Sequence, residues 1–151
     1  NSLGHCFSDE ALNAHLNVMS RSLKKGGIYV VEFTCAYDSV EQEREKDKNH
    51  SWVDEKDSIK ITTTWHPREY DFQKKLRKVV SKIKVENHQN GEAFHFEEEQ
   101  CLRLWYFEDF KNACEKAGFQ IVAVYDQKEN LVTLPRVITG DQGPLYYVLK
   151  R

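Results

Sequence analysis

The sequence predicts an α/β fold interrupted by antiparallel strands, and two observations lead to this prediction. Near the start, a helical pattern is followed by Gly26-Gly27 and then by the apolar run Ile28–Phe33. Near the end, a second helical pattern closes at Gly118 and is followed by two further apolar runs. A helix, a glycine stop and a buried strand form the second half of a βαβ unit, so we expect an α/β sheet built from both ends of the chain.

The bulk composition is that of one globular domain. The chain has 151 residues, of which 40% are hydrophobic and 30% charged, and its net charge is -2. Such a small net charge disfavours a nucleic-acid partner. No apolar run approaches the ~20 residues that a membrane span needs, so we expect no membrane partner. The four cysteines are scattered without a C-x-x-C pair, which predicts reduced thiols and a cytoplasmic protein.

The first helix should begin after Ser8, which can cap it, and should end at Gly26-Gly27. We expect Lys24 and Lys25 in its last turn. One face is apolar at helical spacing, formed by Leu12, Leu16, Met19 and Leu23. The strand Ile28–Phe33 is apolar almost throughout, as expected of a strand covered on both faces.

The middle of the chain is more polar. We expect residues 38–57 to form an exposed excursion, with a short helix or a mobile lid. Residues 59–66 alternate in polarity as a half-buried strand, and Pro67 should end it. Residues 76–86 fit either a helix or a strand, and the Asn90-Gly91 turn that follows favours a hairpin whose second arm is residues 92–105. The basic residues of the first arm face Glu97–Glu99 on the second, which predicts cross-strand charge pairs rather than an RNA-binding stripe.

The last third returns to α/β patterning. Residues 107–117 carry a helical apolar stripe that Gly118 closes, and residues 119–125 and 145–149 read as strands. A longer connection separates these two strands.

This order of elements resembles the second half of a class I S-adenosylmethionine-dependent methyltransferase. The opening NSLGH, the LKKGG before IYVVEF, and the helix RLWYFEDFKNACEKAGF carry the resemblance, which is closest to the small-molecule branch that includes the glycine N-methyltransferases. It implies the C-terminal part of a Rossmann-like sheet whose last strand is antiparallel. A single partial domain would then span residues 1–151, with an α/β core (1–37 and 105–151). Residues 38–104 would form the polar excursion and an antiparallel, substrate-covering insertion.

The resemblance also implies site residues. Ser2 and His5 would lie near the methionine part of the cofactor, S-adenosylmethionine, and Asn1 beside the substrate. Tyr37 and Arg103 are further candidates for substrate binding, Arg103 through an anionic group. Each has a simpler alternative: Asn1 and Ser2 as turn residues, His5 as a packing residue, Tyr37 as a loop start, and Arg103 as a solvated strand residue. No residue is a convincing general base.

The sequence also departs from the family. It has no Gly-rich loop between a strand and a helix, and no acidic residue ending a second strand, so the cofactor-gripping half is absent. We therefore expect a fragment that is inactive alone, whose Ile28–Phe33 edge is covered by a missing N-terminal half or by a second copy. Two alternatives stay open: a non-catalytic interaction or regulatory module derived from this fold, and an unrelated α+β ligand- or RNA-binding domain.

Overall fold

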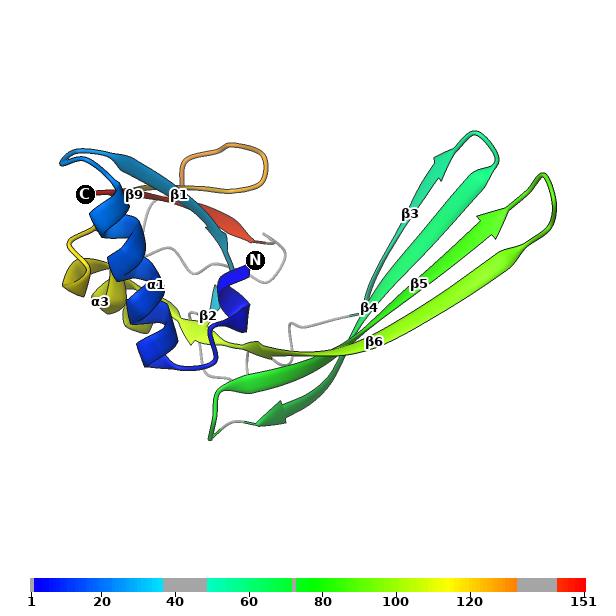
Figure 1. Cartoon of the computed structure of the whole chain (residues 1–151), viewed down its shortest axis with the longest axis horizontal. Coiled ribbons are helices and arrows are strands. Elements are labelled where there is room, and N and C mark those ends of the chain that lie inside the picture. The colour runs from blue at the N-terminus through cyan, green and yellow to red at the C-terminus, as the bar shows by residue number, and fades with distance from the viewer. Residues whose placement is uncertain (1, 37–48, 72, 133–143) are drawn as a thin grey trace.

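The computed structural model describes residues 2–36, 49–71, 73–132 and 144–151, which form a body and a projecting sheet (Figure 1). The body begins with a single 3-10 turn, η1 (Ser2–His5). Its remaining elements are two helices and three strands: α1 (Asp9–Ser22), α3 (Phe107–Lys116), β1 (Ile28–Phe33), β8 (Gln120–Tyr125) and β9 (Leu145–Lys150).

The projecting sheet is a four-stranded antiparallel meander that extends away from the body (Figure 1). Its strands are β3 (His50–Lys56), β4 (Ile59–Asp71), β5 (Leu76–Asn87) and β6 (Ala93–Arg103). Two short parallel strands lie where the sheet meets the body: β2 (Cys35–Ala36) and β7 (Trp105–Tyr106).

Helix α1 forms as its cap and apolar stripe predict. The hydroxyl of Ser8 accepts a hydrogen bond from the N–H of Ala11 at 3.2 Å, and Leu12 and Leu16 are fully buried. The helix ends at Ser22, because Leu23 adopts an extended backbone. The prediction that Lys24 and Lys25 occupy the last turn was therefore wrong.

The body sheet has the order β1-β9-β8, with β9 antiparallel to both neighbours. This confirms the predicted α/β arrangement with an antiparallel last strand. Among the described strands, β1 pairs only with β9, so its other edge is open.

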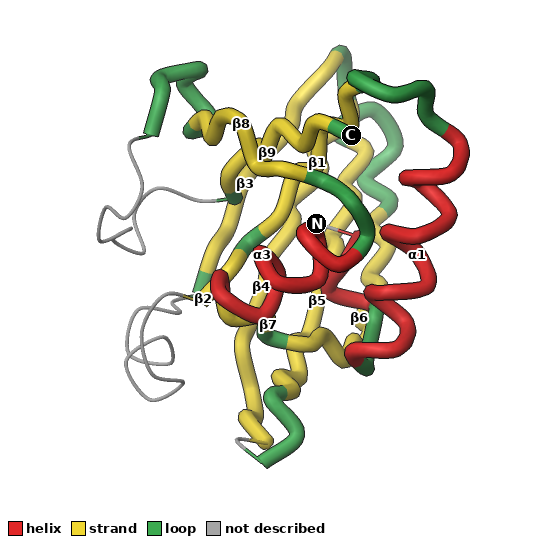
Figure 2. The backbone as a smooth tube through the Cα atoms, turned by 90° about the vertical axis from the view of Figure 1, so that its left-hand side faces the viewer, coloured by secondary structure: helices red, strands yellow, loops and turns green. Residues whose placement is uncertain are grey.

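One face of the body sheet is covered and the other is not. Helices α1 and α3 lie beside one another and pack against the same face, which buries Val31 of β1 (Figure 2). Ile28 and Val30 point the other way and are 49% and 55% exposed. The expectation that β1 is covered on both faces was therefore wrong for the described part of the chain.

The middle of the chain holds more strand than the sequence predicts. His50–Lys56 is a strand rather than part of an open excursion, and a two-residue turn at Asp57-Ser58 pairs it with β4. All of its residues are exposed, as is typical of a charged edge strand. Pro67 does not end β4: the register shifts between Pro67 and Glu69, and the strand continues to Asp71.

The predicted hairpin between β5 and β6 is confirmed. Gly91 adopts a φ of 73° in the turn, where glycine carries no steric penalty. The predicted charge pairing is also present: Lys82 lies 2.9 Å from Glu97, and Lys78 lies 3.6 Å from Glu99. Each of these exposed pairs contributes at most about 1 kcal/mol to the free energy of unfolding. They therefore make the charges of the two strands complementary but add little to the stability of the hairpin.

The body core depends on Phe110, which is fully buried with its ring edge-on to Tyr147 at 5.2 Å. We expect Phe110→Ala to lower the free energy of unfolding by about 3–5 kcal/mol, because it leaves a cavity between α3 and β9. Val18→Ala on α1, where the valine is 53% exposed, is the matched helical control and should change it by less than about 0.5 kcal/mol. Urea unfolding of the two variants measures the difference, and equal losses would contradict this description of the core.

Candidate functional site

The N-terminal turn η1 presents two of the predicted site residues to solvent. Ser2 and His5 are exposed, whereas Leu3 and Gly4 between them are buried. The turn contacts β1 and β6, so it lies where the body meets the projecting sheet (Figure 1). Its backbone is closed by a 3.0 Å hydrogen bond from the N–H of Cys6 to the carbonyl of Leu3.

Trp105 of β7 fixes the position of this turn. Its side chain is 1% exposed, and its indole N–H donates a 3.3 Å hydrogen bond to the carbonyl of Leu3. The turn also packs closely on β6, because a Cβ built on Gly4 would lie in van der Waals contact with Leu102, at 3.4 Å. The turn is therefore held in place by Trp105 and β6, while the side chains of Ser2 and His5 remain accessible to solvent.

Arg103 holds the segment that links η1 to α1. Its guanidinium lies 4.3 Å from the centre of the Trp105 ring and donates hydrogen bonds to the carbonyl of Phe7 at 2.6 Å and to Oδ1 of Asp9 at 2.7 Å. The side chain is only 14% exposed, so it is not a solvated strand residue. Among the described residues, its buried Nε–H has no acceptor.

A second anchor fixes the base of the projecting sheet on α3. Lys75, in the turn between β4 and β5, lies 2.8 Å from Asp109 and 4.8 Å from the centre of the Tyr106 ring. The N–H of Leu104 also donates to the carbonyl of Lys75 at 2.8 Å. Arg103 contacts Asp9 of α1, and Lys75 contacts Asp109 of α3. Because these two contacts are on different helices, together they set the direction in which the sheet leaves the body.

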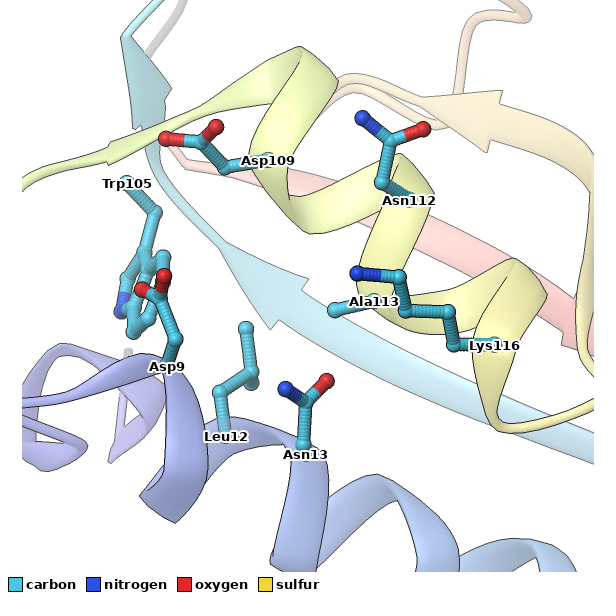
Figure 3. A pocket seen from close by; sticks show the side chains of 8 residues that line it. All are labelled: Asp9, Leu12, Asn13, Trp105, Asp109, Asn112, Ala113 and Lys116. Carbon is cyan, nitrogen blue, oxygen red and sulfur yellow. The ribbon is translucent and has the colours of Figure 1, made fainter.

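A groove lies between α1 and α3, with Trp105 and Asp9 at one end (Figure 3). Its volume of about 120 Å³ is well below the ~300 Å³ at which organic-ligand pockets begin. Its two acidic side chains, Asp9 and Asp109, are already paired with Arg103 and Lys75. The lining residues are Asp9, Leu12, Asn13, Trp105, Asp109, Asn112, Ala113 and Lys116. We do not regard this groove as the substrate site.

The two buried cysteines are not nucleophiles. All four are free thiols, as the sequence predicts, and Cys35 and Cys114 are buried. Burial raises the pKa of Cys114 to about 12, and it raises the pKa of Cys35 strongly, partly opposed by a hydrogen bond with Tyr147. Both thiols therefore stay protonated at neutral pH, and a protonated thiol is a poor nucleophile.

The structure brings three of the five predicted site residues into one region. Ser2 and His5 share η1, and Arg103 reaches the segment directly after it. Asn1 and Tyr37 lie outside the described residues. Sequence reasoning missed Trp105 as the support of the turn, although Arg103 and Trp105 stand two residues apart, the spacing that places side chains on one face of a strand.

No protein-family model and no curated protein matches the chain. Solved structures do match it. DesVI from Streptomyces venezuelae matches with a TM-score of 0.71 at 16% identity, and an S-adenosylmethionine-dependent methyltransferase from Clostridium acetobutylicum with 0.69 at 18%. CalS10, an amino pentose methyltransferase from Micromonospora echinaspora whose structure has S-adenosylmethionine bound, matches with 0.68 at 14%.

The chain has the fold of part of a methyltransferase. Each of the three matches covers 99% of this chain and 54% of the other, so the chain spans about half the length of those proteins. The fold class predicted from the sequence, a partial Rossmann-like methyltransferase sheet with an antiparallel insertion, is thereby confirmed. Within the described ranges, neither helix has the length and apolar character needed to cross a membrane.

The Arg103 contacts make a testable contribution to stability. Arg103→Met should lower the free energy of unfolding by about 1–3 kcal/mol, because it removes charge-assisted hydrogen bonds from a largely buried guanidinium. It should also speed hydrogen exchange at the amide of Cys6, which closes η1.

The control is Arg21→Met, because exposed Arg21 bonds only the carbonyl of Asn17 within α1. We expect that variant to match the wild type within about 0.5 kcal/mol. If the Cys6 amide exchanged at the same rate in all three proteins, Arg103 would not be holding the turn.

Proposed function

We propose that this chain is the substrate-covering part of an S-adenosylmethionine-dependent methyltransferase that acts on a small molecule. The observation that supports the proposal most strongly is the exposed pair Ser2 and His5, on a turn that Trp105 fixes beside the body sheet. In open α/β sheets ligands bind at loops that follow strands, and a turn of this kind provides one wall of such a site.

The side chains of the turn suit the proposed cofactor. S-adenosylmethionine supplies an activated methyl group and leaves as a neutral thioether, so the protein needs no strong general base. Short polar side chains at positions 2 and 5 can bind the charged methionine part without filling the crevice. The remaining tasks are to orient the acceptor and to exclude water.

We propose Asn1, Tyr37 and Arg103 as the residues that bind the acceptor, as the sequence suggests; of these, only Arg103 lies among the described residues. The guanidinium of Arg103 is committed to Phe7 and Asp9, so binding an anionic acceptor would require it to exchange these hydrogen bonds. CalS10 acts on an amino pentose, which makes an amino sugar the first acceptor class to test. A nitrogen acceptor also fits a site in which no base is evident.

Among the described strands, β1 pairs on one edge only. Further strands beside β1 and helices over the exposed Ile28 and Val30 of β1 and Val122 of β8 would complete the body. We propose that a segment with the Gly-rich cofactor loop supplies them, either in the same polypeptide or in a second one, with a second copy of this chain as the other candidate. The second candidate function is a non-catalytic interaction module, and it is supported by the absence of the Gly-rich loop from the sequence.

Methyl transfer by a polypeptide that carries these residues together with a Gly-rich loop tests the proposal. His5→Ala should weaken its affinity for S-adenosylmethionine about five- to tenfold, the effect of losing one hydrogen bond. His88→Ala, in the exposed turn between β5 and β6, should leave the affinity unchanged. Two results together would favour the interaction module. The polypeptide would methylate neither an amino sugar nor another small amine, and the His5→Ala and His88→Ala variants would bind S-adenosylmethionine with equal affinity.

A further inference from the structure

Glu32 is the one charged residue of β1, and it lies on the uncovered face of the body sheet. The strand reads Ile-Tyr-Val-Val-Glu-Phe, and successive side chains of a strand point to opposite faces. Val31 is buried in the core against α1 and α3, so the exposed Glu32 points away from the helices. Ile28 and Val30 share the face of Glu32 and are apolar. The carboxylate therefore changes the chemistry of this face only at the end of the strand.

Two tyrosines lie beside Glu32 in one row across the sheet. Glu32 pairs with Tyr146 of β9, and Tyr146 pairs with Tyr125 of β8. Residues directly opposite one another in antiparallel strands share a face, with Cβ atoms about 4.5–5.5 Å apart. Both tyrosines are half-buried, so part of each side chain is open to solvent. We call Glu32, Tyr146 and Tyr125 the acidic-aromatic row.

A β-bulge in β8 places Tyr125 on this face. The register shifts between Ile121 and Ala123, so β8 holds one extra residue there. Simple alternation from Ile121, which packs on the core, would turn Tyr125 toward the helices. With the extra residue, Val124 is buried instead and Tyr125 points toward the open face. The bulge thus completes the acidic-aromatic row.

The acidic-aromatic row lies at the end of the sheet where α/β proteins bind ligands. Glu32 is the second-last residue of β1, and Tyr125 is the last residue of β8. The two strands run in the same direction, because both are antiparallel to β9, so these residues share the carboxyl end of the sheet. The turn η1 contacts β1 and lies beside the same end of it (Figure 1).

We propose that the acidic-aromatic row binds the protonated amino group of a small organic amine. A carboxylate accepts charge-assisted hydrogen bonds from an ammonium group. The faces of tyrosine rings attract the same cation, and aromatic cages that bind amines use this attraction. Val148, the next residue of β9 on this face, offers an apolar contact for the carbon skeleton of the amine.

Other classes of ligand fit the row less well. The charge of Glu32 repels phosphates and carboxylates. A metal ion needs several ligands, whereas the row holds one carboxylate, and the described residues contain no group of three or more His, Cys, Asp or Glu that could hold a metal. An amino sugar belongs to the proposed class of amines, but the inference concerns binding and does not rest on the proposed methyl transfer.

Two sugars that differ in one group provide the test. D-glucosamine is a cation at about pH 6, whereas D-glucose is neutral and has a hydroxyl in place of the amine. In amide NMR spectra of the 151-residue chain, D-glucosamine should shift the signals of Glu32, Tyr125 and Tyr146 saturably, with a Kd of about 1–10 mM. D-glucose should not shift them. No saturable shift with about 100 mM D-glucosamine, or equal shifts with D-glucose, would overturn the proposal.

Variants assign the binding to the row. Glu32→Gln keeps the size of the side chain but removes its charge, so it should weaken D-glucosamine binding at least about tenfold. Tyr146→Leu should weaken it about two- to fivefold, because it removes a cation–π contact. The matched control is Glu115→Gln, which removes an exposed carboxylate from α3 and should leave the binding unchanged. Circular dichroism checks that the variants keep their secondary structure. Unchanged binding by Glu32→Gln, or an equal loss in Glu115→Gln, would also overturn the proposal.

Discussion

The structure depends on one buried side chain, Trp105, which joins three parts of the fold. Its strand pairs in parallel with β2, which follows β1, and its indole N–H holds η1 through the carbonyl of Leu3. Its ring supports the guanidinium of Arg103, which in turn fixes the segment before α1. The turn, the body sheet and the projecting sheet therefore all contact one residue. Trp105 therefore determines the position of Ser2 and His5, and of any site that they form.

Local signals in the sequence were sufficient for the elements of the body. Helix α1 was correctly predicted from the Ser8 cap and the apolar stripe with Leu12 and Leu16. The strands β1, β8 and β9 were correctly predicted from their apolar runs. These signals work because each depends on a few neighbouring residues. The predicted end of α1, with Lys25 in the last turn, lay three residues beyond Ser22, because Leu23 adopts an extended backbone before the glycines are reached.

Long-range contacts account for what the sequence did not reveal. β3 has the composition of an exposed excursion and becomes a strand only by pairing with β4. Arg103 looked like a solvated or ligand-binding residue because its partners, Phe7 and Asp9, lie far away in the sequence. The candidate site was therefore predictable as a turn containing Ser2 and His5, but its support was not.

Two exposed surfaces of the described chain differ in what they offer a partner. The β1 edge offers backbone hydrogen bonds, which additional strands of the same sheet would satisfy. The tip of the projecting sheet carries exposed apolar side chains on one face, including Trp52, Phe94 and Phe96. The solved structures that share this fold are about twice as long, which is compatible with a body completed along β1.

The central claim is that the part of the sheet that grips the cofactor lies outside these residues. Isothermal titration calorimetry of the 151-residue chain with S-adenosylmethionine tests it most directly. We expect no binding at micromolar concentrations, because the Gly-rich loop is absent from the sequence and, in the proposed function, η1 provides only one wall of the site. Saturable binding with micromolar affinity by this chain alone would contradict the claim.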